Sequence, residues 1–219
     1  MTYLGLSLLI SRHVSIRNIN LEVIMTQLES LNVFDLDGTL IKVNSFREVT
    51  KKFMLILMRD LHITPLIYIT TSFIFRRLGL ISHFEFKRRT VEIFEKSLRE
   101  QQKQEICQEV FVKYINKTIL NLMLSSVNAI ICTAAPYAYV SRINFNKKIC
   151  IICALHPKNK LPDLPNYGAG KVENIKAFFK NENINVINIF TDNLNNDQPL
   201  VDYADHAFLV HGEHIEKIK

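Results

Sequence analysis

The sequence predicts an α/β protein, with a doubly wound parallel sheet and an all-helical subdomain inserted after the first strand. Three observations lead to this prediction. Short, β-branched and mostly continuous apolar runs recur along the chain, as expected of parallel strands that are buried on both faces. Between residues 45 and 125 the apolar residues instead recur at steps of three and four, which is typical of helices. Beyond residue 125, strands alternate with helical segments.

The predicted core is divided by the helical subdomain. Residues 1–24 form an N-terminal extension that carries no recognisable chemistry. The core is expected at 25–44 and 120–219, and the helical subdomain, which we call the cap, at 45–119.

The first strand is expected to end with "LNVF", just before a glycine turn. The later strands are expected at 128–132, 149–155, 184–190 and 206–210. Gly170 precedes a helical segment, "KVENIKAFFK", and Pro199 is expected to open a short helix, because proline is favoured at a first helical position.

Composition narrows the classes of partner. The formal charge of +6 and the pI near 9.1 favour anionic partners, either phosphorylated substrates or an anionic membrane surface. We expect no nucleic-acid partner, because no basic motif is interleaved with aromatic residues. Cys150 and Cys153 match a CxxC pattern but lie in the apolar run "ICIICAL", so we interpret them as part of a buried strand in a cytoplasmic protein. Composition says nothing about oligomeric state.

Residues 61–75, "LHITPLIYITTSFIF", contain no Asp, Glu, Lys or Arg. They fall short of the roughly 18 residues that a spanning helix needs, so no membrane span is predicted. Two interpretations stay open. The segment is either a buried core helix or an interfacial helix, which Arg76 and Arg77 would hold in peripheral contact with a membrane.

Two acids follow the first strand directly. Asp35 and Asp37 would project from its carboxyl end, which faces the ligand crevice in an open α/β sheet. Carboxylates there are costly to desolvate unless a cation or a reaction uses them. The alternative is an Asx-type turn, in which one Asp caps backbone amides.

Three later segments fall where such a sheet would bring them close to these acids. Thr133 ends a strand and is followed by Ala134, which would suit phosphate binding, although Thr is also common in strands. Lys171 opens a helix, where the dipole disfavours a cation, so an anionic partner or plain solvent exposure would explain it. Asp192 and then Asp197 follow a buried strand, which suggests a hard cation.

The order of these segments resembles a known family. "VFDLDGTL", "IICTAAP", "GAGK" and "TDNLNNDQPL" are similar to the four motifs of the haloacid dehalogenase superfamily of phosphatases, over roughly residues 31–210. The helical insertion between the first two motifs resembles the phosphoserine phosphatase-like branch. The apolar character of the insertion and the last motif are also similar to bacterial phosphatidylglycerophosphatase C.

The resemblance implies a set of catalytic roles. Asp35 would be the nucleophile that forms an aspartyl-phosphate, and Asp37 the general acid and then the general base. The Asp35 carboxylate, the Asp37 carbonyl and Asp192 would bind Mg²⁺. An acid at position 37 favours phosphoester hydrolysis, because the dehalogenases of this superfamily lack that acid and its ion pumps carry Thr there.

The resemblance assigns supporting roles to the remaining motif residues. Thr133 and the Ala134 amide would hold the phosphoryl oxygens, and Lys171 would stabilise their charge and that of the nucleophile. Thr39 would support the first motif. Asp197 would orient the lysine or the waters of the metal ion, and the spacing leaves Asn196 as the alternative for that role. The fourth motif also has Thr191 where glycine is usual.

We therefore predict a Mg²⁺-dependent phosphatase that acts on a phosphate monoester. The apolar cap favours a lipid or other amphiphilic phosphate, and a small soluble phosphate such as phosphoserine is the rival. A phosphomutase shares the same pair of acids, and an inactive binding module would keep the same fold.

Overall fold

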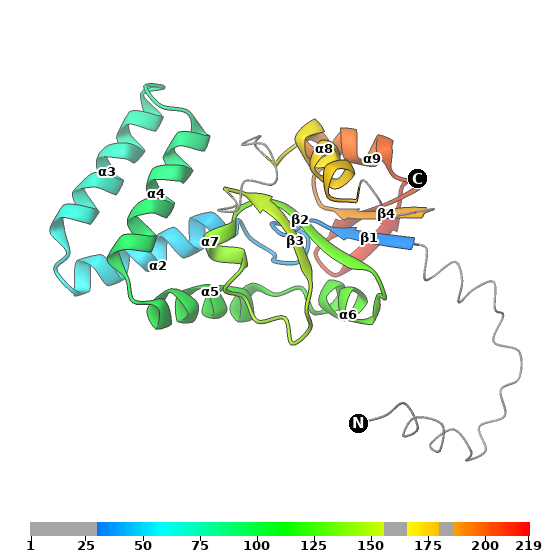
Figure 1. Ribbon diagram of the computed structural model, residues 1–219, viewed down its shortest axis with the longest axis horizontal. Coiled ribbons are helices and arrows are strands. Elements are labelled where there is room, and N and C mark those ends of the chain that lie inside the picture. Colours follow the sequence, from blue (N-terminus) through cyan, green and yellow to red (C-terminus); the bar gives the residue numbers. More distant parts are fainter. Residues whose placement is uncertain (1–29, 156–165, 180–185) are drawn as a thin grey trace, which may run out of the picture.

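The computed structural model of the protein describes residues 30–155, 166–179 and 186–219 (Figure 1). The predicted N-terminal extension at 1–24 lies outside the described residues. The described chain forms a six-stranded sheet in the order β3-β2-β1-β4-β5-β6, which confirms the predicted fold class of a mainly parallel sheet with a helical insertion. The strands are β1 (Ser30–Phe34), β2 (Ala129–Pro136), β3 (Cys150–Ala154), β4 (Val186–Thr191), β5 (His206–His211) and β6 (His214–Lys217).

Strand β6 is the one part of this sheet that we did not predict. The strands β1 to β5 pair in parallel, whereas β6 pairs antiparallel with β5. A two-residue turn joins β5 to β6, and Gly212 in that turn has a φ of +61°. Because β6 is short, polar and at an edge of the sheet, it lacks the apolar pattern by which buried strands are recognised.

The sheet is covered on both faces, and the side chains of β1 alternate between them. Leu31 and Val33 pack under α8 (Ala169–Phe178) and α9 (Leu194–Tyr203), which cover one face (Figure 1). Phe34 points to the other face, where it stacks on Phe190 with ring centroids 4.6 Å apart. Helix α6 (Lys117–Ser125) packs against that face. Burial on both faces accounts for the continuous apolar sequence of these strands.

The helical insertion has an apolar core of its own. It consists of α2 (Ser45–Arg59), α3 (Ile63–Arg77), α4 (His83–Ser97) and α5 (Glu100–Tyr114). Its core rests on the short helix α7 (Tyr137–Val140) that follows β2. Tyr139 of α7 is fully buried, with its ring 4.9 Å from that of Phe94 and 6.0 Å from that of Phe46. This contact fixes the insertion over the carboxyl ends of β1 and β2.

The chain crosses between the sheet and the insertion at two adjacent points. The amide of Lys42 donates to the carbonyl of Tyr114 at 2.9 Å, and the amide of Asn116 donates to the carbonyl of Leu40 at 2.9 Å. Ile41 and Ile115 pair between them as an antiparallel bridge. The outgoing and returning segments are therefore hydrogen-bonded to each other.

Helix α3 is largely unburied. Among its residues only Ile69 and Ser72 are buried, while Ile63, Ile67 and Ile74 are about half or more exposed. Of the two interpretations of this apolar segment, the structure does not match a buried core helix. Within the described residues, no helix combines the length and the apolar character needed to cross a membrane.

Candidate active site

Asp35 lies at the carboxyl end of β1, between β2 and β4. Its amide continues the sheet by donating to the carbonyl of Phe190 at 2.9 Å. Asp35 is therefore held by the sheet itself, at the point where the strand order reverses direction along the chain. Crevices at such points are the usual ligand sites of doubly wound sheets.

Asp37 belongs to the turn that follows. Leu36 and Leu40 are fully buried and anchor the turn, and the amide of Ile41 donates to the carbonyl of Leu36 at 2.8 Å. The carboxylate of Asp37 accepts a hydrogen bond from the amide of Ser45, at the start of α2, at 2.9 Å. The second acid thus faces the insertion, whereas Asp35 faces the sheet.

Thr133 and Ala134 lie beside these acids. Strand β2 extends to Pro136, three residues beyond the predicted end at Thr133, and its pairing with β3 shifts register between Thr133 and Pro136. The buried Thr133 hydroxyl accepts a hydrogen bond from the amide of Ala135 at 3.0 Å. Its own proton can therefore be donated to a ligand, and Ala134 lines the same cavity.

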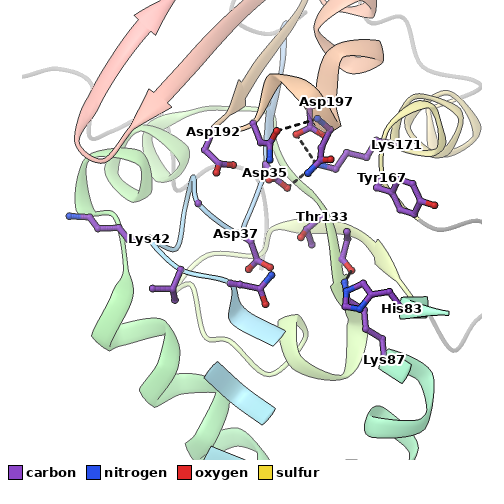
Figure 2. Close-up of a pocket in the computed structure, with 16 residues that line it drawn as sticks. Asp35, Asp37, Lys42, His83, Lys87, Thr133, Tyr167, Lys171, Asp192 and Asp197 are labelled. Atoms are coloured by element: carbon purple, nitrogen blue, oxygen red, sulfur yellow. Dashed lines mark hydrogen bonds and ion pairs between the residues drawn. The ribbon is translucent and has the colours of Figure 1, made fainter. Parts of the chain in front are cut away.

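Lys171 joins the first motif to the last. It lies in the first turn of α8 with its side chain buried, and its Nζ atom is 2.9 Å from Oδ1 of Asp35 (Figure 2). The same ammonium is 2.9 Å and 3.0 Å from the two carboxylate oxygens of Asp197. Of the two explanations for a cation at this helix start, the contacts match an anionic partner and not solvent exposure.

The fourth motif is organised around Asp197. Its Oδ2 atom accepts a hydrogen bond from the Thr191 hydroxyl at 2.7 Å, and that hydroxyl in turn accepts one from the amide of Asn193 at 3.2 Å. Threonine in place of the usual glycine thus has a structural role here. Asn196, the alternative that the spacing left open, is exposed and does not hold the lysine.

The helix after Asp192 begins earlier than predicted. Pro199 is the sixth residue of α9, so the prediction that it opens the helix was wrong. Asn193 is the N-cap residue, and its side chain accepts from the amide of Asn196 at 3.2 Å. The Asn193 side chain satisfies an otherwise unpaired amide, so the helix begins there although Pro199 removes one internal hydrogen bond.

Asp192 lies against the turn that carries Asp37. Gly38 has a φ of +85°, and a Cβ atom at this position would come within 1.9 Å of Oδ2 of Asp192. The hydroxyl of Thr39 lies 3.5 Å from Oδ1 of the same carboxylate. The glycine therefore permits both the turn and the close approach of the acid.

Burial dominates the electrostatics of the carboxylates. Burial raises the pKa of Asp35 to about 7, although Lys171 acts in the opposite direction. Burial also raises the pKa values of Asp37 and Asp192 above their ordinary range. For Lys171, burial alone would lower the pKa of the ammonium, but the carboxylates of Asp35 and Asp197 raise it above its ordinary value.

These residues line one cavity of about 510 Å³. All of the predicted catalytic, substrate-binding and metal-binding residues line it, whereas Thr39, a predicted supporting residue, does not line it and contacts Asp192. Figure 2 shows His83 and Lys87, from α4 of the insertion, on the side opposite Asp35 and Lys171. The ammonium of Lys87 donates to the carbonyl of Ala134 at 3.2 Å.

Sequence reasoning missed several residues that line this cavity. They are Lys42, Val43, Asn44, His83, Lys87, Tyr167 and Asn193. Lys87 belongs to a run of three basic residues, Lys87-Arg88-Arg89, and of these only Lys87 lines the cavity. Arg88 and Arg89 instead pair with Glu85 on the outer surface, at 2.8 Å and 2.7 Å.

The donor set is of the kind that Mg²⁺ prefers. Across the described ranges, no three His, Cys, Asp or Glu side chains converge as a metal cluster. The expected set, however, has only two side-chain carboxylates, Asp35 and Asp192, together with the Asp37 carbonyl. All three are oxygen donors, and the raised pKa values show that the surrounding cations only partly offset the cost of burying the acids. The residues therefore fit a hard divalent cation.

Comparison with known proteins shows a likeness of fold. No family model matches the chain, and no curated protein matches it. A crystal structure of a protein of unknown function from Bordetella pertussis Tohama I is similar to 82% of this chain and 88% of its own, with 13% identity and a TM-score of 0.57. A phosphoserine phosphohydrolase-like protein from Francisella tularensis subsp. tularensis SCHU S4 matches 81% of this chain and 85% of its own, with 17% identity and a TM-score of 0.47.

Proposed function

We propose that this protein is a Mg²⁺-dependent phosphatase of the haloacid dehalogenase superfamily, which hydrolyses a phosphate monoester through an aspartyl-phosphate on Asp35. The observation that carries the proposal is the bridge made by Lys171, whose ammonium contacts both Asp35 and Asp197. This bridge brings together three of the four motifs at one edge of the sheet. Burying these charged groups would be costly unless they were paired with one another.

The first step is attack by the Asp35 carboxylate on phosphorus. A bond forms between a carboxylate oxygen and phosphorus as the bond from phosphorus to the leaving oxygen breaks. Lys171 favours the ionised form of the attacking carboxylate against the effect of burial, and it contacts Oδ1 and leaves Oδ2 for attack. The phosphoryl oxygens are held by the Thr133 hydroxyl and the Ala134 amide. Mg²⁺, bound by Asp35, Asp192 and the Asp37 carbonyl, would neutralise charge between the phosphate and the carboxylates.

Asp37 would act as the general acid and then as the general base. Its raised pKa suits a general acid, which gives a proton to the leaving alkoxide. The resulting carboxylate then takes a proton from water as the water oxygen attacks phosphorus, which releases inorganic phosphate and regenerates Asp35. The hydrogen bond from the Ser45 amide holds Asp37 in place for both steps.

We propose a lipid or other amphiphilic phosphate as the substrate, with a small soluble phosphate such as phosphoserine as the alternative. The exposed apolar side chains of α3 support the first class, because such a surface next to basic residues suits contact with an anionic membrane. We therefore also propose peripheral membrane contact through α3.

The proposed mechanism is tested by replacing the nucleophile. Asp35→Asn should abolish phosphate release from an aryl phosphate, because a neutral amide does not form the acyl phosphate, and EDTA should abolish release by the wild type until Mg²⁺ is added. Asp202→Asn, an exposed position of α9 outside the cavity, is the matched control. Undiminished turnover by Asp35→Asn would overturn the mechanism, and a wild type that releases no phosphate from any ester would indicate an inactive binding module.

A further inference from the structure

The cap contains a second hollow, a groove of about 620 Å³ between α2, α3 and α4. It is lined chiefly by apolar side chains, namely Phe46, Met54, Ile69, Phe73 and Phe86. Among the described residues that line it, none is acidic. Its volume and apolar lining are those of a small-molecule site.

The groove opens next to the catalytic cavity. Asn44, the N-cap residue of α2, and His83, the first residue of α4, line both hollows. The Asn44 side chain is fixed because it accepts a hydrogen bond from the amide of Arg47 at 2.9 Å. The next residue, Ser45, donates its amide to Asp37. Asp37, which would protonate the leaving oxygen, is therefore held by the residue that follows Asn44, at the mouth of the groove.

This arrangement defines where the leaving group would lie. A phosphoryl group bound by Thr133 and Lys171 would direct its ester oxygen toward Asp37, on the side of the insertion. From Asp37 the leaving group would continue past Asn44 and His83 into the apolar groove. Cations of Arg47, Lys51 and Arg76 also line the groove, and they would suit additional anionic groups near the ester.

We infer that this groove binds an alkyl or acyl chain of the leaving group, so that the substrates are phosphate monoesters of long-chain alcohols or of lipids. The inference rests on the proposed phosphatase function and adds the site that selects the substrate. It assigns the specificity to side chains of α2, α3 and α4, away from the four motifs.

The test is a series of n-alkyl phosphates of increasing chain length, used below the concentrations at which they form micelles. In the wild type, kcat/KM for phosphate release should rise about fourfold for each added methylene until the groove is filled. Binding of the same esters, measured by calorimetry, should tighten in parallel. A kcat/KM and an affinity that do not change with chain length would overturn the inference.

A groove-filling variant locates the effect. Thr70 is an exposed residue of α3 that lines the groove, so Thr70→Trp should reduce the gain from chain length while leaving turnover of an aryl phosphate unchanged. Thr64→Trp is the matched control, because Thr64 is exposed on the same helix but does not line the groove. Equal behaviour of the two variants would overturn the inference. If binding depends on chain length and on Thr70 but no ester is hydrolysed, the groove stands and the proposed phosphatase function falls.

Discussion

The carboxylate of Asp192 rests against Gly38, so closely that a methyl group on this glycine would come within 1.9 Å of Oδ2. The contact joins the first motif to the last and leaves no space for a side chain on Gly38. The positions of two proposed metal ligands, the Asp37 carbonyl and the Asp192 carboxylate, therefore depend on the absence of a side chain at Gly38.

Gly38→Ala should therefore displace Asp192 and reduce phosphatase activity by two or more orders of magnitude. It should also cost about 1 kcal/mol of stability, because alanine is strained at positive φ. Gly79→Ala is the control, since Gly79 has a φ of +74° but has open space around its Cβ position. Activity assays and urea denaturation of both variants test this, and a similar loss of activity in both would refute the steric explanation.

Lys171→Met should damage both stability and activity. It leaves the buried carboxylates of Asp35 and Asp197 without their cation, which costs about 3–5 kcal/mol for a buried pair. Activity should fall about 10²- to 10³-fold. The double variant Lys171→Met/Asp197→Asn should recover part of the unfolding free energy, because one unpaired charge is removed, but none of the activity. If the change in the free energy of unfolding of the double variant equals the sum of the changes of the two single variants, Lys171 and Asp197 are not coupled.

Thr191→Val tests the hydroxyl that replaces the usual glycine. The variant removes the 2.7 Å hydrogen bond to Asp197 and leaves a buried carboxylate oxygen with one donor fewer, at a cost of about 1–3 kcal/mol. Thr191→Ser keeps the hydroxyl and is the control. Thermal unfolding should separate the two variants, and equal melting temperatures would mean that the hydroxyl contributes nothing.

His83 should give the fold a measurable dependence on pH. Partial burial, with Lys87 and Arg76 nearby, lowers the pKa of its imidazole from 6.5 to about 4. Between these pH values the imidazole of His83 binds a proton in the unfolded chain but not in the folded chain. Its contribution to the free energy of unfolding is therefore complete above pH 6.5 and is lost as pH falls toward 4. Because the side chain is exposed, solvent screening should keep the change below about 1 kcal/mol. Urea denaturation of wild type and His83→Gln should give stabilities that separate as pH falls from 6.5 toward 4, with the wild type losing more, and parallel curves would be the contrary result.

The apolar surface of α3 should bind anionic vesicles. Ile67 and Ile74 are exposed on one side of this helix, and Arg76 and Arg77 follow them. Ile67→Glu/Ile74→Glu should reduce sedimentation with vesicles that contain phosphatidylglycerol. Val112→Glu, at an exposed apolar position of α5, should have little effect. A wild type that remains in the supernatant would refute the membrane contact.

The sequence was most informative where the sheet itself places the residues. Asp35 and Thr133 lie on adjacent parallel strands, so that their convergence follows from strand order alone. The two lysines of the cavity differ in this respect. Lys171 was identified because it follows two glycines at a helix start, a local signal. Lys87 was not singled out, because which residue of α4 faces the cavity depends on how Tyr139 seats the insertion on the core.

The shape of the groove was beyond sequence reasoning for the same reason. The pattern of α3 is apolar on nearly all sides, so periodicity cannot tell which side chains pack, which line a groove and which remain exposed. Strand β6 was missed because it is short and polar. The start of α9 was misplaced because Pro199 gave a stronger sequence signal than the N-cap residue Asn193.

The paired crossings at Lys42 and Tyr114 and at Leu40 and Asn116 bring the chain into and out of the insertion side by side. Because the two crossings are hydrogen-bonded to each other, a change in the length of a helix between them need not separate the strands that carry the acids. Related chains with a different insertion could therefore present a different surface to the same cluster of acids and lysine at the edge of the sheet.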